Sequence, residues 1–261
     1  MLRHPVITQT PDFIDDIHLF CDRWCTRCGM TAKCRQAKTV ADGGCEPIQT
    51  AEAPDGLFQF LQVQFQKSAT LWEARAETCG GERPGTGGRA DAALRASRRS
   101  HEHPLFIEAQ RYASRVGEWF RAEEPWFDGR HKALEVHELA GLPNASFAEA
   151  MLDIRAAAES IGWYQFDIAA KLQRAVEALE SPIADSRGST RSTVDGLAKG
   201  ALVAIDRSIN AWLRLKRYRA DLPDSVFPLL VQLDHLRRGV DDTFPQARFF
   251  VRPGLDPSPS R

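Results

Sequence analysis

The chain contains no run of about 18 consecutive apolar residues, the length that a membrane-spanning helix needs, so the sequence excludes such a helix. It also lacks an excess of one charge, because 34 Lys and Arg oppose 35 Asp and Glu for a formal net charge of -1. This balance excludes a globally basic nucleic-acid-binding protein, although it is compatible with a local basic patch. The first twenty residues carry three Asp and no apolar core, which argues against a secretory signal and predicts a cytoplasmic protein.

The sequence motifs of several common enzyme classes are also missing. The chain has no G-x-x-x-x-G-K-S/T phosphate loop, no G-x-S-x-G nucleophile turn and no H-E-x-x-H zinc motif. No E-x-x-H pair occurs either, so the usual ligand set of a diiron helical bundle is incomplete. The sequence therefore names neither a substrate nor a reaction.

What is present is a helical pattern that repeats along much of the chain. Hydrophobic residues make up 43% and charged residues 26%, and 261 residues correspond to one large domain or two small ones. Apolar residues recur at spacings of three and four, which predicts helices over 11–29, 56–77, 104–122, 130–140, 146–181, 193–215 and 222–244. The one β-like stretch is the short segment Arg248 to Val251. We therefore expect an all-α fold, an antiparallel helical bundle with an N-terminal cysteine-rich helix-loop metal site.

Composition divides the chain into five parts. Residues 1–50 form the cysteine-rich segment, expected to pack on the bundle, and residues 51–78 form a helix. Residues 79–103 are rich in Gly and Arg and have few large apolar side chains, which predicts a flexible linker whose arginines are solvated or touch an acidic partner. Residues 104–252 form the bundle, and residues 253–261 are expected to be a disordered tail.

The strongest candidate site is a cluster of cysteines with the spacing Cys21-x3-Cys25-x2-Cys28-x5-Cys34. On a helix over 11–29 the first three thiols would share one face, and a turn at Gly29 would bring the fourth back toward them. Four thiolates around one centre bind a [4Fe-4S] cluster or a tetrahedral zinc ion. Nearby basic residues favour the thiolate form and would offset the negative charge of a cluster: Arg23, Arg27, Lys33 and Arg35.

The sequence leaves the identity of the metal open. A [4Fe-4S] cluster is our first expectation and zinc the alternative, because a structural zinc site more often uses two C-x2-C pairs and the motif has one. His18 lies on the same predicted helix face and could replace a missing ligand. Cys45 is a spare ligand, whereas Cys79 is expected to be incidental. A third interpretation is that the cysteines are plain thiols on a helix.

Two local resemblances concern this motif. The segment CTRCGMTAKC, residues 25–34, is similar to the cluster loop of the helix-hairpin-helix DNA glycosylases, which hold a [4Fe-4S] cluster in an all-helical domain. The resemblance implies a cluster held by this spacing, but not glycosylase activity, because the glycine-rich catalytic hairpin is absent. The C-x3-C-x2-C opening resembles the motif of radical SAM enzymes, although here a fourth cysteine follows and no strand–helix alternation does.

Three functions remain open at this point. The first is a metal-binding helical protein in a redox or partner-binding role, with a protein, an acidic surface or nucleic acid as the partner. The second is a structural adaptor stapled by zinc. The third is a bundle oxidoreductase, for which at least two buried carboxylates must meet a His. The candidate carboxylates lie beside apolar stripes on separate helices: Glu108, Glu135, Glu159 and Asp206. The alternative is that these four are solvated residues at the boundaries of amphipathic helix faces.

Overall fold

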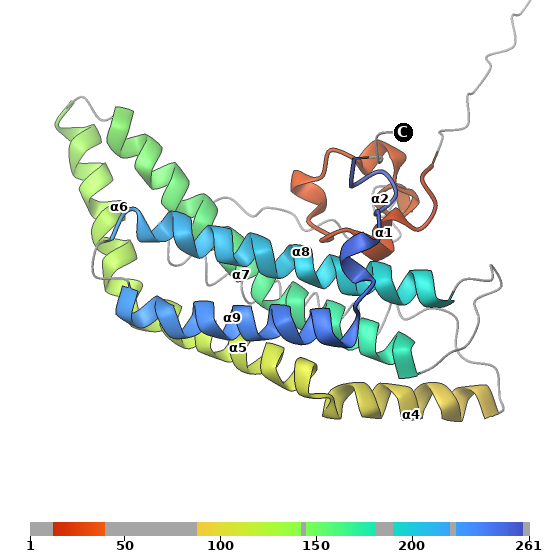
Figure 1. Ribbon diagram of the computed structural model, residues 1–261. Coiled ribbons are helices and arrows are strands. Elements are labelled where there is room, and N and C mark those ends of the chain that lie inside the picture. Colours follow the sequence, from red (N-terminus) through yellow and green to blue (C-terminus); the bar gives the residue numbers. More distant parts are fainter. Residues whose placement is uncertain (1–12, 40–87, 142–144, 181–189, 220–222, 258–261) are drawn as a thin grey trace, which may run out of the picture. The chain divides into compact units, whose positions relative to one another are not determined.

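Figure 1 shows the computed structural model, which describes residues 13–39, 88–141, 145–180, 190–219 and 223–257. The chain divides into two compact units, which are described one at a time. The cysteine unit comprises residues 1–50 and 251–261, and the helical unit comprises residues 51–250. Every regular element in the described ranges is a helix and none is a strand, which confirms the all-α prediction.

The helical unit is built from long helices. Its elements are α4 (Gly88–Glu102), α5 (Pro104–Ala122), α6 (Glu124–Leu139), α7 (Ala145–Glu180), α8 (Thr190–Lys216), α9 (Pro223–Thr243) and the 3-10 helix η4 (Ala247–Phe249). Four of these helices closely match predicted segments: α5, α7, α8 and α9. Each buries the apolar stripe from which it was predicted. The β-like segment from Arg248 to Val251 is not a strand, and its first two residues belong to η4.

The core of the helical unit lies between helices that run side by side. Helix α7 packs against α5 and α8, and α9 packs against the same two helices (Figure 1). Large aromatic side chains fill the space between them, and Trp119 and Trp212 meet edge to face with their ring centroids 4.7 Å apart. At Gly239 on α9 an added Cβ would lie 2.6 Å from a methyl carbon of Leu105, so the absence of a side chain permits the close approach of α9 to α5.

A buried polar contact links α5 to α8 inside this core. The Tyr112 hydroxyl lies 2.7 Å from the Ser208 hydroxyl and accepts a hydrogen bond from the Trp212 Nε1–H at 2.9 Å. All three side chains are buried, so these protein groups replace the water that the hydroxyl would bind in the unfolded chain. Burial raises the pKa of Tyr112 to about 12.

A proline sets the boundary between α4 and α5. Pro104 is the first residue of α5, where its missing N–H costs no helical hydrogen bond. The preceding residue, His103, is extended, as residues before proline usually are. His103 Nδ1 accepts the backbone N–H of Leu105 at 3.2 Å and so caps the new helix.

Helix α4 replaces much of the linker predicted over 79–103. Residues 88–102 are helical because α4 packs against α7 and α5 through small side chains, of which Ala96 and Ser100 are buried. In the part of α4 whose burial is described, residues 95–102, the buried side chains are small, and small residues give a weak apolar stripe in the sequence. Similarly, α6 begins at Glu124, earlier than the predicted 130, and ends close to Gly141, the stop that the sequence predicted, whose φ is +63°.

The cysteine unit differs most from its prediction, because the helix expected over 11–29 is largely absent. The unit contains α1 (Ile17–Phe20), η1 (Cys25–Arg27), η2 (Thr31–Lys33) and α2 (Arg35–Thr39). Asp16 and Arg23 have left-handed backbone angles, φ 59° and 56°, which no α-helix accommodates. The Asp22 carboxylate also accepts the N–H of Trp24 at 3.2 Å, a local bond that competes with helical bonding.

The described part of the C-terminal tail is a defined turn rather than a disordered segment. Residues 252–256 are held by backbone hydrogen bonds from Leu255 and Asp256 to the carbonyl of Arg252, each 3.1 Å long. Residues 258–261 lie outside the described residues, as do the helix predicted over 56–77, Cys45 and Cys79.

Candidate metal centre

Short helical turns, rather than one helix face, position the four cysteines. Cys21, Cys28 and Cys34 each follow a helix of three or four residues as its C-cap, and each has an extended backbone. Each of these residues donates its N–H to a carbonyl within the preceding turn, over 3.1–3.3 Å. Cys25 is the first residue of η1. The prediction that three thiols share one helix face is therefore wrong.

Two of the cysteine sulfurs accept backbone hydrogen bonds. The N–H of Arg23 points to Cys21 Sγ at 3.3 Å, and the N–H of Met30 points to Cys28 Sγ at 3.4 Å. In both cases the donor lies two residues after the cysteine. An N–H that donates to sulfur stabilises the thiolate, which is the form that binds a metal. The Cys21 thiol, when protonated, donates a hydrogen bond to the carbonyl oxygen of His18, which lies 3.6 Å from Sγ.

The four cysteines differ in exposure. Cys25 is exposed, Cys21 and Cys28 are half-buried, and Cys34 is buried at 8% exposure. They are not paired with one another as disulfides. The set therefore combines one buried cysteine with three that are at least partly exposed.

Several cationic side chains of this segment lie against aromatic rings. The guanidinium of Arg27 lies 4.0 Å from the ring centroid of Trp24, and Arg35 lies 5.1 Å from that of Phe13. Lys38 approaches the same Phe13 ring at 5.8 Å, and Lys33 is exposed. The aromatic rings thus contact two arginines that are next to cysteines in the chain, since Arg27 precedes Cys28 and Arg35 follows Cys34.

The cysteine side chains do not form a ligand group in the described structure. Across its described residues no three His, Cys, Asp or Glu side chains are close enough together to hold a metal ion. The residues near the motif nevertheless suit a metal chemically, because they supply sulfur donors, N–H groups directed at sulfur, and positive charge. Filling the site requires the four side chains to turn toward a common centre.

The carboxylates proposed for an oxidoreductase site are not brought together either. Each is half-buried or exposed and bonds to a neighbour of its own. Glu108 accepts from Gln232 at 2.8 Å, and Asp206 lies 3.9 Å from Arg237. The other two pair within their own helices: Glu135 with His131 at 3.2 Å and Glu159 with Arg155 at 3.0 Å. Ion pairing of this kind is typical of boundary positions on amphipathic helices.

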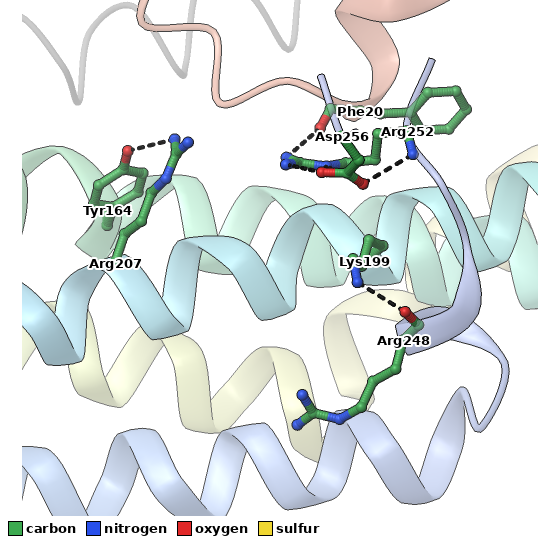
Figure 2. A network of polar contacts seen from close by, with 7 residues as sticks. All are labelled: Phe20, Tyr164, Lys199, Arg207, Arg248, Arg252 and Asp256. Carbon is green, nitrogen blue, oxygen red and sulfur yellow. Dashed lines mark hydrogen bonds and ion pairs between the residues drawn. The ribbon is translucent and has the colours of Figure 1, made fainter. Parts of the chain in front are cut away.

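Other polar contacts of the helical unit were not anticipated. Asp167 and Lys171 form a buried ion pair on α7 with 3.6 Å between charged atoms, at the spacing of one helical turn. Arg207 donates to the Tyr164 hydroxyl at 2.9 Å (Figure 2). The i, i+4 spacing of Asp167 and Lys171 can be read from the sequence. Their burial cannot, because it depends on which other helices pack over them.

An open pocket of about 550 Å³ lies between the start of α7 and the end of α8. On its wall Asp153 accepts hydrogen bonds from Arg214 and, at 2.9 Å, from the Tyr218 hydroxyl. The bond from Arg214 holds the pKa of Asp153 below its usual range, and the bond to Asp153 raises the pKa of Tyr218. These groups bond to one another, so the pocket does not direct them at a ligand.

Comparisons with protein-family models, with curated proteins and with solved structures found no match to this chain. Among the described residues, no helix is both long enough and apolar enough to cross a membrane. The chemistry of the residues themselves is therefore the basis for a proposed function.

Proposed function

We propose that the protein binds a metal centre through Cys21, Cys25, Cys28 and Cys34, most simply a [4Fe-4S] cluster, with a single zinc ion as the alternative. The observation that carries the proposal is the pair of backbone N–H groups directed at Cys21 and Cys28 within the C-x3-C-x2-C-x5-C spacing. Hydrogen bonds to sulfur are a usual part of thiolate metal sites and tune both cluster types and zinc sites.

The small core of the cysteine unit supports the proposal. Of its described residues, only Ile17, Phe20, Cys34 and Arg252 are buried. A unit of this size rarely gains enough stability from its apolar core alone, and a structural metal is one common remedy. Binding of a metal by four cysteines would supply the missing stability directly.

The charge around the motif also supports it. Four thiolates around a doubly positive ion or cluster core carry a net charge of -2. From residue 22 to residue 38 the chain has five Lys or Arg and one Asp, an excess of +4. This excess offsets the charge of the centre and leaves a cationic rim, which suits an acidic partner such as nucleic acid.

Metal binding must draw the four side chains together, since they do not form a group in the described structure. Coupling of this kind is ordinary, because a preformed site rarely exists before the metal binds. Short turns joined at left-handed residues suit such closure better than a rigid helix would, because rotation at a few backbone angles moves each sulfur. In this proposal the helical unit, as an antiparallel bundle, contributes the surface for a partner.

Anaerobic purification followed by an absorption spectrum and metal analysis tests the proposal. A brown protein with a broad band near ~400 nm and about four irons per chain identifies a [4Fe-4S] cluster. A colourless protein with about one zinc per chain identifies the zinc site of a structural adaptor. A protein with neither metal after both anaerobic purification and reconstitution refutes the metal centre.

Substitution of single cysteines locates the ligands. Cys25→Ser and Cys28→Ser should each lose the metal, because serine is a poor ligand for both centres. Cys79→Ser is the matched control, since Cys79 lies outside the motif. Equal metal content in all three variants would contradict the assignment. Salt-sensitive retention of the loaded protein on DNA or RNA, compared with these variants, tests the nucleic-acid role.

A further inference from the structure

The C-terminal turn packs against the segment that carries the cysteines. Both ends of the chain belong to the cysteine unit, which the sequence interrupts with the whole helical unit. Gly254 has a φ of +70°, and a Cβ added to it would lie 2.4 Å from Ile14 Cδ1 and 3.4 Å from Ile17 Cδ1. The same Cβ would lie 3.3 Å from Met30 Cε. The turn therefore contacts the residue whose N–H points to Cys28.

A buried arginine ties this turn to the backbone at the first cysteine. Arg252 is 7% exposed, and its Nη1 donates to the carbonyl of Phe20 at 3.5 Å, directly before Cys21 (Figure 2). Its Nη2 and Nε donate to the Asp256 carboxylate at 2.6 and 3.0 Å, so the buried charge is paired. The Arg252 N–H also donates to Asp256, at 2.9 Å, which closes the turn.

From these contacts we infer that residues 251–257 are a strap for the cysteine centre, with Arg252, Gly254 and Asp256 as positioning residues that govern how firmly the metal is held. The strap touches the chain at Phe20 and at Met30, beside two of the four proposed ligands. It thereby limits the movement of both. The inference concerning metal rests on the proposed function, whereas the packing itself does not.

The test compares full-length wild-type protein with Arg252→Ala, Arg252→Lys and Gly254→Val. The matched control is Arg248→Ala, since Arg248 forms a two-bond ion pair with Asp241, 2.7 Å for each bond, on the exposed surface of the helical unit. Two properties are measured on each protein as purified anaerobically. The first is the rate at which 4-(2-pyridylazo)resorcinol removes iron or zinc, and the second is amide hydrogen exchange over residues 13–39.

We expect Arg252→Ala and Gly254→Val to release metal about tenfold faster or more, the usual effect of removing a group that supports a ligand. Exchange should also accelerate at Ile14, whose N–H donates to Lys33 across the segment, and at Cys21. Arg252→Lys keeps a charge for Asp256 without the planar fork, so its release rate should be intermediate. Arg248→Ala should match the wild type in both measurements, and the helical circular dichroism should be the same in all proteins.

Each pattern of results decides between the two claims. Unchanged exchange in Arg252→Ala and Gly254→Val refutes the strap, whatever the metal content. Faster exchange with an unchanged release rate refutes the link between strap and metal. If wild-type protein holds no metal, the proposed function fails, and faster exchange in these two variants still supports the strap. If Gly254→Val loses helical signal, amide exchange in Arg252→Lys tests the strap instead. That variant removes the planar guanidinium but adds no atoms near Ile14.

Discussion

Replacing Tyr112 by Phe should destabilise the helical unit through the groups that the hydroxyl leaves behind. The hydroxyl is the acceptor for the Trp212 N–H at 2.9 Å and lies 2.7 Å from the Ser208 hydroxyl. All three side chains are buried, so no water replaces the lost partner. A buried polar group without a partner costs about 1–3 kcal/mol. Phenylalanine avoids the desolvation of the tyrosine hydroxyl, which offsets part of this cost, and we expect a net loss of about 2 kcal/mol.

Tyr164→Phe is the matched control for this experiment. Tyr164 is also largely buried, but the group that donates to it belongs to Arg207, which is exposed and keeps its access to water. The same chemical change should therefore cost about 0.5 kcal/mol there. The two variants differ in whether the donor that loses its acceptor is buried, as Trp212 is, or exposed, as Arg207 is. This difference is the cause of the expected difference in stability.

Denaturant unfolding followed by far-ultraviolet circular dichroism measures both variants, because that signal reports the helices. The midpoint should fall for Tyr112→Phe at an unchanged m value, and the melting temperature should fall by about 4–8 °C. The double variant Tyr112→Phe/Ser208→Ala should lose less than the sum of its single variants, since fewer polar groups are left unpaired. A stability for Tyr112→Phe within about 0.5 kcal/mol of that of Tyr164→Phe would refute the reasoning.

Two further predictions concern protonation. The pKa of Tyr112 is about 12 in the folded protein and ordinarily 10, so the folded state keeps a proton that the unfolded state releases. Its contribution to stability is therefore full below about pH 10 and falls by about 2–3 kcal/mol as the pH rises to about 12; Tyr112→Phe should show a correspondingly smaller loss in unfolding measurements at the two pH values. Asp153→Ala should lower the pKa of Tyr218, because the bond to Asp153 is the main cause that raises it; tyrosinate absorbance near ~295 nm follows this change, and an unaltered titration curve would argue against the contact.

Apolar periodicity predicted the long helices because each buries one continuous face. In α7 the stripe through Ile154, Ile161, Ile168 and Leu172 is fully buried, and its spacing alone predicts a helix. Prolines and glycines added the boundaries, as Gly141 does after α6. These properties are local, so one sequence suffices to find them.

The same periodicity was misleading at the cysteines. Phe13, Ile14, Ile17 and Phe20 fit a helical stripe, but only residues 17–20 are α-helical. Asp16 and Arg23 adopt left-handed angles, and side chains bond to backbone N–H groups two residues on. Aspartate is known for such bonds, whereas a left-handed arginine has no signature in sequence. The sequence shows the spacing of the cysteines, but it did not predict the short turns in which they lie.

The sequence by itself determined the helical class and the extents of helices α5, α7, α8 and α9, because these depend on residue type and on spacing over a few turns. Only the tertiary structure decided that α4 is a helix, that the carboxylates stay apart, and that Arg252 returns to the carbonyl of Phe20. Each of these depends on contacts between residues distant in the chain. Their free energies come from burial and pairing with a specific neighbour, which spacing along one segment does not encode.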